Sequence, residues 1–402
     1  MEKDIKFEVM KKIADTNFKY QNLTKIDKID SNSPPSVFVG SKLKYPSVNV
    51  GILSPIEKEK EAWVYDDEAY WAQNDFQIKD VIKLRDSLLN SRFQAKVSDS
   101  RTNKKFVEIA KEIAISSKPV DIELELNKNL NIGRKKDKVV VPHGMKAGLK
   151  KAKITSNVKV HQKLDHAMND EIKAEQGILS LYKNKFSEYT LNKILSVGVL
   201  GLKKNKKLVP TRWSITATDD IIGKNLIKQI KNYKWIEDHE LYFGQFMGNC
   251  YLILLIPGVW SYELFELYFP GSSWNPSSEI KASTDHELYS GRKSYASQTV
   301  GGYYAARLPI LEHLNKIKKQ ATVVTVRIET PSYWAALGVW VVRESVRKAF
   351  KNKNLKFKSL DELIESAKKI GYIKYGFNPS GIFKKSLLLN STKTQKNLRG
   401  WF

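Results

Sequence analysis

Residues 241–269 read LYFGQFMGNCYLILLIPGVWSYELFELYF and contain three short apolar runs. The runs lie at 241–246, 251–256 and 262–269, and only a few residues separate each from the next. Branched and aromatic residues favour strands, and connections this short favour antiparallel neighbours. The stretch therefore predicts an antiparallel meander. The run at 251–256 is far shorter than the roughly 20 residues that cross a bilayer, so no membrane partner is expected.

Segments with helical spacing of apolar residues flank the meander. Helices are predicted at 304–319 and 339–350, with a strand at 323–328 between them, and Ser359 and Glu362 have the spacing of a capping box. On the N-terminal side, 106–115 has helical spacing and 120–126 alternates like a strand. The expected fold class is mixed α/β (α+β): an antiparallel-rich sheet with packed helices, plus a smaller helix-rich C-terminal domain.

The composition changes along the chain and suggests four parts. They are a polar N-terminal segment at 1–30, a large domain at 31–275, a second domain at 285–388 and a flexible tail at 390–402. The Ser-rich stretch PGSSWNPSSE, which ends at Glu279, marks the expected boundary between the two domains.

The overall charge is strongly positive. The chain has 402 residues, a formal net charge of +25 and a pI of about 9.6. Such a field attracts polyanions, and nucleic acid is the usual one, although AT-rich genomes also produce lysine-rich sequences. The single cysteine, Cys250, excludes an intramolecular disulfide and a cysteine-only zinc site, so no zinc is expected. It also indicates a reducing compartment, and we expect a cytoplasmic location.

Two segments concentrate this positive charge. Residues 134–163 carry ten lysines and arginines against the single acid Asp137, and their poor periodicity predicts an exposed basic loop. A second cluster begins at Lys203. The residues expected to contact DNA are Arg134, Lys135, Lys136, Lys146, Lys150, Lys151, Lys153, Lys203 and Lys204. The alternative is that both clusters are ordinary solvated surfaces.

A pair of carboxylates offers a possible catalytic site. Asp219 and Asp220 follow residues 213–218, which alternate like a strand, and paired acids at a strand end can hold Mg²⁺ in nucleases. Arg212 on the same strand could bind a phosphate. The same two acids would also suit the N-cap of a helix at 221–230, so both interpretations stay open.

A glycine-rich segment adds two arginines to these candidates. Arg292 lies in GRKSYA and Arg307 in GGYYAARL, where two glycines before a helix would let backbone amides approach an anion. The alternative is a glycine hinge with core tyrosines. The candidate catalytic set is thus Arg212, Asp219, Asp220, Arg292 and Arg307, and Mg²⁺ is expected only if the protein is an enzyme. Cofactors are otherwise unknown.

The last eight residues carry the most specific pattern in the chain. Gln395, Leu398, Trp401 and Phe402 fit the pattern Q-x-x-[aliphatic]-x-x-[aromatic]-[aromatic] of peptides that bind a DNA sliding clamp. One helical turn would bring the leucine beside the two aromatic residues as a single apolar plug. The alternative is that the aromatic pair packs back on the fold.

Several motifs together resemble the archaeal Nre DNA-repair family. They are SPPSVFVG, YPSVNVG, LVPTRWSITATDD, PGVWSYELFE, GRKSYA, GGYYAARL and YWAALGVWVVRE, and they extend from about Ser33 to the C-terminus. The resemblance implies a role in repairing DNA damage, clamp (PCNA) binding through Gln395, Leu398, Trp401 and Phe402, and cooperation with Uvr excision proteins. Family members often begin with a four-cysteine zinc element, which has no counterpart in this sequence.

Three functions are compatible with these features. The first is an adaptor that binds DNA and the clamp, and the second is a metal-dependent nuclease or another nucleotide-acting enzyme. The third is an RNA-binding protein with an incidental tail. A buried Arg212 beside an open cleft would favour the enzyme, whereas Asp220 capping its helix would favour the adaptor.

Overall fold

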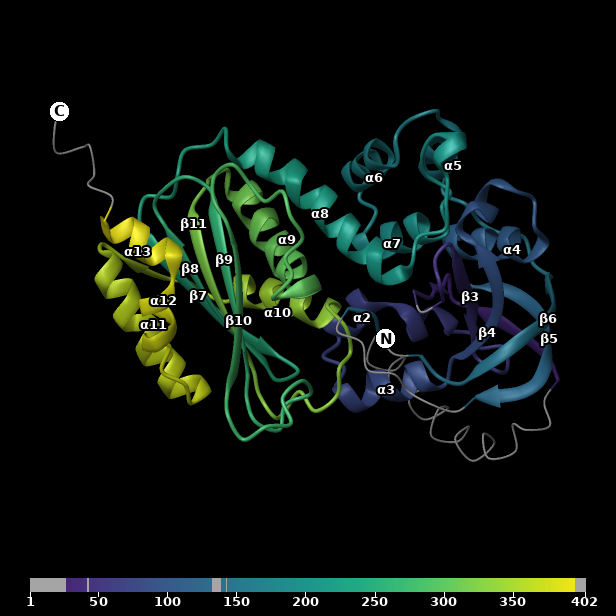
Figure 1. Ribbon diagram of the computed structural model, residues 1–402, viewed down its shortest axis with the longest axis horizontal. Helices are drawn as coiled ribbons and strands as arrows, with labels where there is room; N and C mark the ends of the chain where they lie inside the picture. Colours follow the sequence, from purple (N-terminus) through teal and green to yellow (C-terminus); the bar gives the residue numbers. More distant parts are fainter. Residues whose placement is uncertain (1–26, 42, 132–138, 142, 395–402) are drawn as a thin grey trace. The chain divides into compact units, whose positions relative to one another are not determined.

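The computed structural model describes residues 27–41, 43–131, 139–141 and 143–394 (Figure 1). The chain divides into two compact units between Ile222 and Gly223. Each unit is built around one six-stranded sheet, which confirms the mixed α/β class. In the parts of the chain that the structure describes, no helix is both long and apolar enough to span a membrane.

The sheet of unit 1 has the strand order β1-β5-β6-β4-β3-β2. Its strands are β1 (Lys28–Ser33), β2 (Val37–Val39), β3 (Ser47–Ser54), β4 (Leu89–Lys96), β5 (Val120–Asn131) and β6 (Lys146–Ile154). Only β4 and β6 pair in parallel. The strand predicted at 120–126 is confirmed as the first part of β5. The predicted basic loop at 134–163 is wrong over 146–154, because β6 pairs with both β4 and β5 there.

The helices of unit 1 are short, apart from the last one. They are η2 (Ala62–Asp66), α2 (Glu68–Gln73), α3 (Ile78–Asp86), η3 (Val97–Arg101), α4 (Lys105–Ile115), α5 (Gln162–Asn169), α6 (Ala174–Lys183), α7 (Glu188–Ser196), η4 (Lys203–Asn205) and α8 (Thr211–Ile230). The helix predicted at 106–115 is α4. Helix α8 continues across the division between the units.

The strand predicted at 213–218 is wrong, because these residues belong to α8. Buried positions recur every four residues along it, at Ser214, Thr218, Ile222 and Leu226, which is a helical and not a strand spacing. The helix begins at Thr211, directly after Pro210, whose carbonyl accepts the amides of Trp213 and Ser214. Proline is favoured at a helix start, and this signal outweighs the two-residue alternation.

The sheet of unit 2 has the order β10-β9-β11-β8-β7-β12. Its strands are β7 (His239–Phe246), β8 (Asn249–Ile256), β9 (Ser261–Tyr268), β10 (Lys281–Glu287), β11 (Thr322–Glu329) and β12 (Leu355–Phe357). β7 and β8 form a tight hairpin in which Met247 and Gly248 both have positive φ. The predicted meander is wrong beyond this hairpin, because β11 lies between β8 and β9. The loop 270–280, at which a domain boundary is expected, connects the neighbouring strands β9 and β10.

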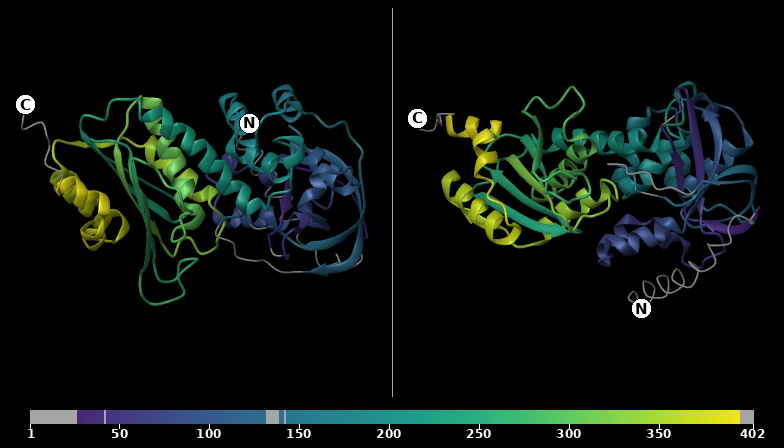
Figure 2. Two further views of the ribbon diagram at one scale, coloured as in Figure 1. Left: turned by 45° about the horizontal axis from the view of Figure 1, so that its top comes forward. Right: turned by 60° about the horizontal axis from the view of Figure 1, so that its bottom comes forward.

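Helices cover both faces of this second sheet (Figures 1 and 2). Helices α9 (Val300–Ile317) and α10 (Trp340–Lys351) lie on one face, and α11 (Leu360–Tyr375), α12 (Ser380–Lys385) and α13 (Leu387–Thr394) on the other. All eight residues of β8 are buried as a result, which explains the continuous apolar run at 251–256. Ser359 caps α11 by accepting the amide of Glu362, as its spacing predicts.

Candidate functional site

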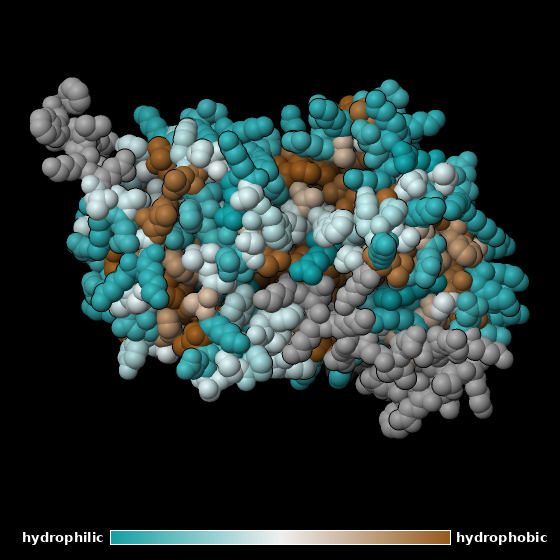
Figure 3. Space-filling model, viewed as in Figure 1, coloured by the Kyte–Doolittle hydropathy of each residue, from teal (hydrophilic) through white to brown (hydrophobic). Residues whose placement is uncertain are grey.

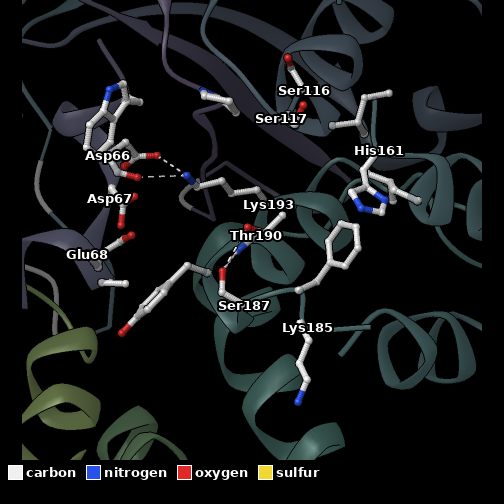
Figure 4. A pocket seen from close by; sticks show the side chains of 18 of the residues that line it. Asp66, Asp67, Glu68, Ser116, Ser117, His161, Lys185, Ser187, Thr190 and Lys193 are labelled. Atoms are coloured by element: carbon white, nitrogen blue, oxygen red, sulfur yellow. Dashed lines mark hydrogen bonds and ion pairs between the residues drawn. The ribbon is translucent and has the colours of Figure 1, made fainter. Parts of the chain in front are cut away.

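A pocket of about 450 Å³ lies in unit 1 (Figure 4). Its walls are the junction of η2 and α2, the C-terminal end of α4, the start of α5 and the start of α7. Aromatic side chains of Trp63, Phe186 and Tyr189 line it together with carboxylates, hydroxyls and Lys193. Pockets of this size with a few polar groups among apolar walls are typical of small-molecule sites.

Asp66 anchors one side of the pocket in a buried ion-pair network. Its carboxylate pairs with Arg85 of α3 and with Lys193 of α7, whose Nζ lies 2.7 Å from Oδ2. Lys193 also donates to the main-chain carbonyl of Asp66 at 3.3 Å, and Figure 4 shows the two side chains pointing toward one another. The network therefore joins η2, α3 and α7 and fixes this wall.

The charges in this network stabilise one another. Burial by itself raises the pKa of Asp66, but the positive charges of Lys193 and Arg85 hold that pKa below its ordinary value. Burial likewise lowers the pKa of Lys193, but the carboxylates of Asp66 and Glu68 raise it above the ordinary value. Asp66 and Lys193 are therefore both charged at neutral pH.

Glu68 is the unusual member of the pocket. It is only 9% exposed, and its Oε2 atom is buried with no hydrogen-bond partner. Burial, together with the negative charge of Asp66, raises the pKa of Glu68 to about 7. A carboxyl group with this pKa exchanges its proton near neutral pH, which is the property of a general acid or base.

Helix caps fix the remaining polar groups. Asp67 caps α2 by accepting the amide of Tyr70 at 2.9 Å, and Ser187 caps α7 by accepting the amide of Thr190 at 3.2 Å. His161 caps α5 through Nδ1, and its ring meets the edge of Phe186 with the centroids 5.0 Å apart. These caps orient the polar groups with little freedom, so the pocket is preformed.

The structure does not assemble the predicted carboxylate site. Asp219 and Asp220 lie in the middle of α8, where successive side chains point about 100° apart, so neither the strand-end nor the N-cap interpretation holds. Asp219 is buried and Asp220 half-buried. Arg212 is the second residue of the same helix and is half-buried. Across 27–41, 43–131, 139–141 and 143–394, no group of three or more His, Cys, Asp and Glu side chains could hold a metal ion.

The two other candidate arginines lie in unit 2, and both bind acids of β10. Arg292 donates to Asp285 at 2.7 Å and to the carbonyl of His286 at 2.9 Å. Arg307 is 1% exposed and donates to Glu287 at 2.8 Å. Both contacts tie β10 to the segments around α9. Their geometry is that of structural ion pairs.

The glycines before Arg307 lie inside α9. A Cβ atom on Gly302 would lie 2.4 Å from Oε1 of Glu266 in β9, so only glycine lets α9 approach β9 so closely. The anion beside the helix start is therefore a carboxylate of the protein itself. Tyr303 and Tyr304 are buried as core residues.

The β6 lysines lie on the sheet of unit 1, whose β5–β6 side is mostly hydrophilic in Figure 3. Lys150, Lys151 and Lys153 are exposed, and Lys146 is half-buried. Lys150 and Lys151 both pair with Glu125 of β5, at 2.7 Å and 2.9 Å, and these contacts lower the pKa of Glu125 to about 2. Glu125 thus neutralises part of the β6 charge. Arg134, Lys135 and Lys136 lie outside the described residues.

Lys203 and Lys204 belong to a denser cluster. Arg101 of η3 donates to the carbonyl of Lys204 at 2.7 Å, which brings η3 against η4. Burial lowers the pKa of Lys206, and the positive charges of Lys111 and Lys203 lower it further. We call Arg101, Lys111, Lys203, Lys204 and Lys206 the η3–η4 basic cluster. Its members from η3 and α4 were not predicted, because they are distant in sequence.

The clamp peptide, Gln395 to Phe402, lies outside the described residues. The pocket residues Asp66, Glu68 and Lys193 were not predicted either. One signal was present in the sequence, because residues 66–68 read DDE between aromatic residues, which is a denser group of acids than the pair at 219–220. Nothing in the sequence placed Lys193 beside them.

Comparison with known proteins identifies the class of protein to which this arrangement belongs. The model of the N-terminal region of archaeal Nre proteins matches residues 4–275, and that of the C-terminal region matches residues 287–401. The chain therefore belongs to the archaeal Nre family. No solved structure matches it.

Three relatives are similar over most of their length. DNA repair protein NreA of Haloferax volcanii is 37% identical over 83% of this chain and 81% of its own. DNA repair protein NreA of Archaeoglobus fulgidus is 39% identical over 87% of this chain and 88% of its own. DNA repair protein NreB of the same organism is 32% identical over 83% of each chain.

Proposed function

We propose that this protein acts in DNA repair and holds DNA on the η3–η4 basic cluster. The names of the three relatives support the repair role. The net charge of +25 supports a polyanionic partner. The observation that carries the DNA-binding part is the gathering of cations from η3, α4 and η4 at one place.

The cluster keeps like charges close together. The carboxylate of Glu108 offsets part of it by pairing with Lys111. Lys203 and Lys204 stay exposed, and burial, followed by the positive charges of Lys111 and Lys203, lowers the pKa of Lys206. A phosphate backbone would relieve this repulsion and release its own counterions, which is the main source of affinity for nucleic acid.

The salt dependence of DNA binding tests this proposal. Replacing Lys203 and Lys204 with Gln removes two phosphate contacts, so the slope of log affinity against log salt should fall by about 1.8 for duplex DNA. The control variant replaces Lys351 and Lys353, two exposed lysines of unit 2, and should leave the slope unchanged. An equal slope in wild type and the η4 variant would reject the cluster as the DNA contact.

We also propose that the C-terminal peptide binds a sliding clamp. The support is the sequence pattern of Gln395, Leu398, Trp401 and Phe402 and the family resemblance. Calorimetry with a purified archaeal clamp should give a Kd near micromolar, about −8 kcal/mol. Trp401→Ala with Phe402→Ala should weaken binding by at least about two decades, because aromatic anchors dominate such interfaces. Lys396→Ala, at a position the pattern leaves open, is the control.

Unchanged affinity in the double variant would reject the motif, and a lowered melting temperature would indicate that the aromatic pair packs on the fold.

The resemblance also makes Uvr excision proteins proposed partners. Their association is tested by co-purification from cells after DNA damage. Loss of co-purification only in the clamp-peptide variant would mean that the clamp bridges this protein and the Uvr proteins.

A second candidate function is an enzyme acting on a nucleotide-type substrate in the unit 1 pocket. The observation in its favour is Glu68, a buried carboxyl with a pKa of about 7 at a pocket lined by aromatic rings. The rate of such an activity in the wild type should change around pH 7, and Glu68→Gln should abolish the activity. The RNA-binding alternative is tested by competition with RNA.

A further inference from the structure

Two large aromatic side chains lie side by side on the surface of unit 1. Tyr45 is 56% exposed and Trp213 is 51% exposed. Their ring centroids are 6.4 Å apart, and the ring planes are tilted by 36°. A single exposed aromatic residue is ordinary, but a contiguous exposed pair usually marks a binding surface.

Trp213 is held in place by the hydrogen bonds at the start of α8. Its amide donates to the carbonyl of Pro210 at 2.7 Å. The hydroxyl of Thr211 accepts the amide of Val39 at 2.9 Å and lies 3.3 Å from the hydroxyl of Ser196. The helix start is thus fixed to β2 and α7, so the Trp213 ring is presented without loss of backbone freedom on binding.

The η3–η4 basic cluster lies next to this aromatic pair. The amide of Val97 donates to the carbonyl of Pro46, and the carbonyl of Val97 accepts the amide of Leu208, both at 2.9 Å. The chain beside Tyr45 therefore touches the first residue of η3, which in turn touches the segment that follows η4. Lys204 is four residues before Leu208 and so lies at most about 14 Å of chain away from it.

Further cations are neighbours of the pair in the chain or in the sheet. Lys44 precedes Tyr45 and is exposed, and Arg212 precedes Trp213. Lys96 is exposed opposite Ser47 in the β3–β4 ladder, and Lys207 is exposed just before Leu208. The surface therefore combines two exposed aromatic side chains with several positive charges close to them in the chain and in the sheet.

We propose that Tyr45 and Trp213 form a stacking platform for unpaired bases, so that this surface recognises single-stranded nucleic acid. The inference rests on the proposed function and names the form of its substrate. Bases in a duplex cover one another's faces, whereas bases of a single strand are free to stack on aromatic side chains. The cations then hold the phosphates on either side of the stacked bases.

The test compares affinities for three labelled oligonucleotides of equal length. The full-length protein is titrated with oligo-dT, with oligo-rU and with a DNA duplex, and binding is followed by fluorescence anisotropy. Wild type should bind oligo-dT more tightly than the duplex. Trp213→Ala and Tyr45→Ala should each weaken oligo-dT binding roughly tenfold and change duplex binding by less than about twofold. Trp213→Phe should restore most of the affinity.

Trp334→Ala is the matched control, because Trp334 is 55% exposed but lies in unit 2. It should leave the affinity for oligo-dT unchanged. Melting temperatures of all variants are measured beside the titrations, and Tyr45→Ala serves as the second probe if Trp213→Ala proves unstable.

The outcomes separate this inference from the proposed function. If both platform variants bind oligo-dT like wild type while the Lys203 and Lys204 variant flattens the salt dependence, the platform is rejected and DNA binding stands. If wild type binds none of the three oligonucleotides, both the platform and the proposed DNA binding are rejected. Equal losses on oligo-dT and oligo-rU support single-strand recognition without discrimination of the sugar. A loss confined to oligo-rU overturns the DNA assignment.

Discussion

Replacing Glu68 with Gln should stabilise the protein at alkaline pH and have little effect at acidic pH. The pKa of Glu68 is about 7 in the folded protein, against an ordinary value of 4.5. This difference corresponds to about 3 kcal/mol at about 1.4 kcal/mol per pKa unit. The side chain is only 9% exposed, so solvent screening should reduce this free energy little.

The direction of the effect follows from proton binding. Because the folded state has the higher pKa, it binds more protons than the unfolded state between about pH 4.5 and pH 7. The contribution of Glu68 to stability is therefore neutral below about pH 4.5, becomes unfavourable as the pH rises and stays unfavourable above pH 7. Gln resembles the protonated carboxyl group in shape and lacks this pH dependence.

The measurement is urea unfolding of wild type and Glu68→Gln at pH 5 and pH 8. The free energy of unfolding of the variant, relative to wild type, should be about 2 to 3 kcal/mol greater at pH 8 than at pH 5. Glu171→Gln removes an exposed carboxylate of the same unit and is the control. If the Glu68 variant gains no more at pH 8 than the control, the raised pKa is refuted, and with it the case for Glu68 as an acid or base.

Two further predictions concern unit 2 and share the same assay. Arg327 is 6% exposed and pairs with Glu266 at 2.6 Å and with Glu329 at 2.9 Å. Arg327→Gln should lower the free energy of unfolding by about 3 to 5 kcal/mol, because it leaves two buried carboxylates uncompensated. A decrease below about 1 kcal/mol would contradict this. Gly302→Ala should lower the free energy of unfolding by about 1 to 3 kcal/mol, because its Cβ would meet the same Glu266 carboxylate. Gly381→Ala is the control and should not destabilise the protein, because a Cβ there would have no atom within 4 Å. Equal decreases in the two variants would refute the steric argument.

The elements of unit 2 were largely predictable, but their arrangement was not. Apolar runs and caps are local signals, and they located β7, β8, β11, α9 and α10 to within a few residues. The insertion of β11 between β8 and β9 depends on a pairing across more than 60 residues, which no local pattern encodes. Its eight buried residues fit a central strand, but they do not specify the neighbours.

The errors at α8 and β6 have different causes. In α8, β-branched and aromatic residues alternate with small polar ones, and tertiary burial at every fourth position overrides their strand preference. In β6, lysines on the exposed face make the strand look like a loop, although Ala147, Leu149 and Ala152 are buried on the other face. Charge density alone therefore does not separate an exposed strand from a loop.

The candidate site was hidden for a related reason. Asp66 and Lys193 are far apart in the sequence, and each is an ordinary charged residue until the fold brings them within 2.7 Å. The unusual pKa of Glu68 arises from burial beside Asp66, which only the packed structure creates. The same holds for the platform, where Tyr45 and Trp213 come from opposite ends of unit 1.

Helix α7 connects the two surfaces that carry these proposals. Its N-cap Ser187 and Lys193 in its last turn line the pocket, and at its C-terminal end Ser196 lies against Thr211, two residues before Trp213. Lys193 and Ser196 are three residues apart, which is about 4.5 Å along the helix axis. Glu68 and Trp213 lie on different helices, and independent sites normally act additively, to within about 0.5 kcal/mol. The effects of Glu68→Gln and Trp213→Ala on oligo-dT affinity should therefore add. A larger coupling would mean that a strand stacked on the platform also reaches into the pocket, and that the two sites serve one substrate.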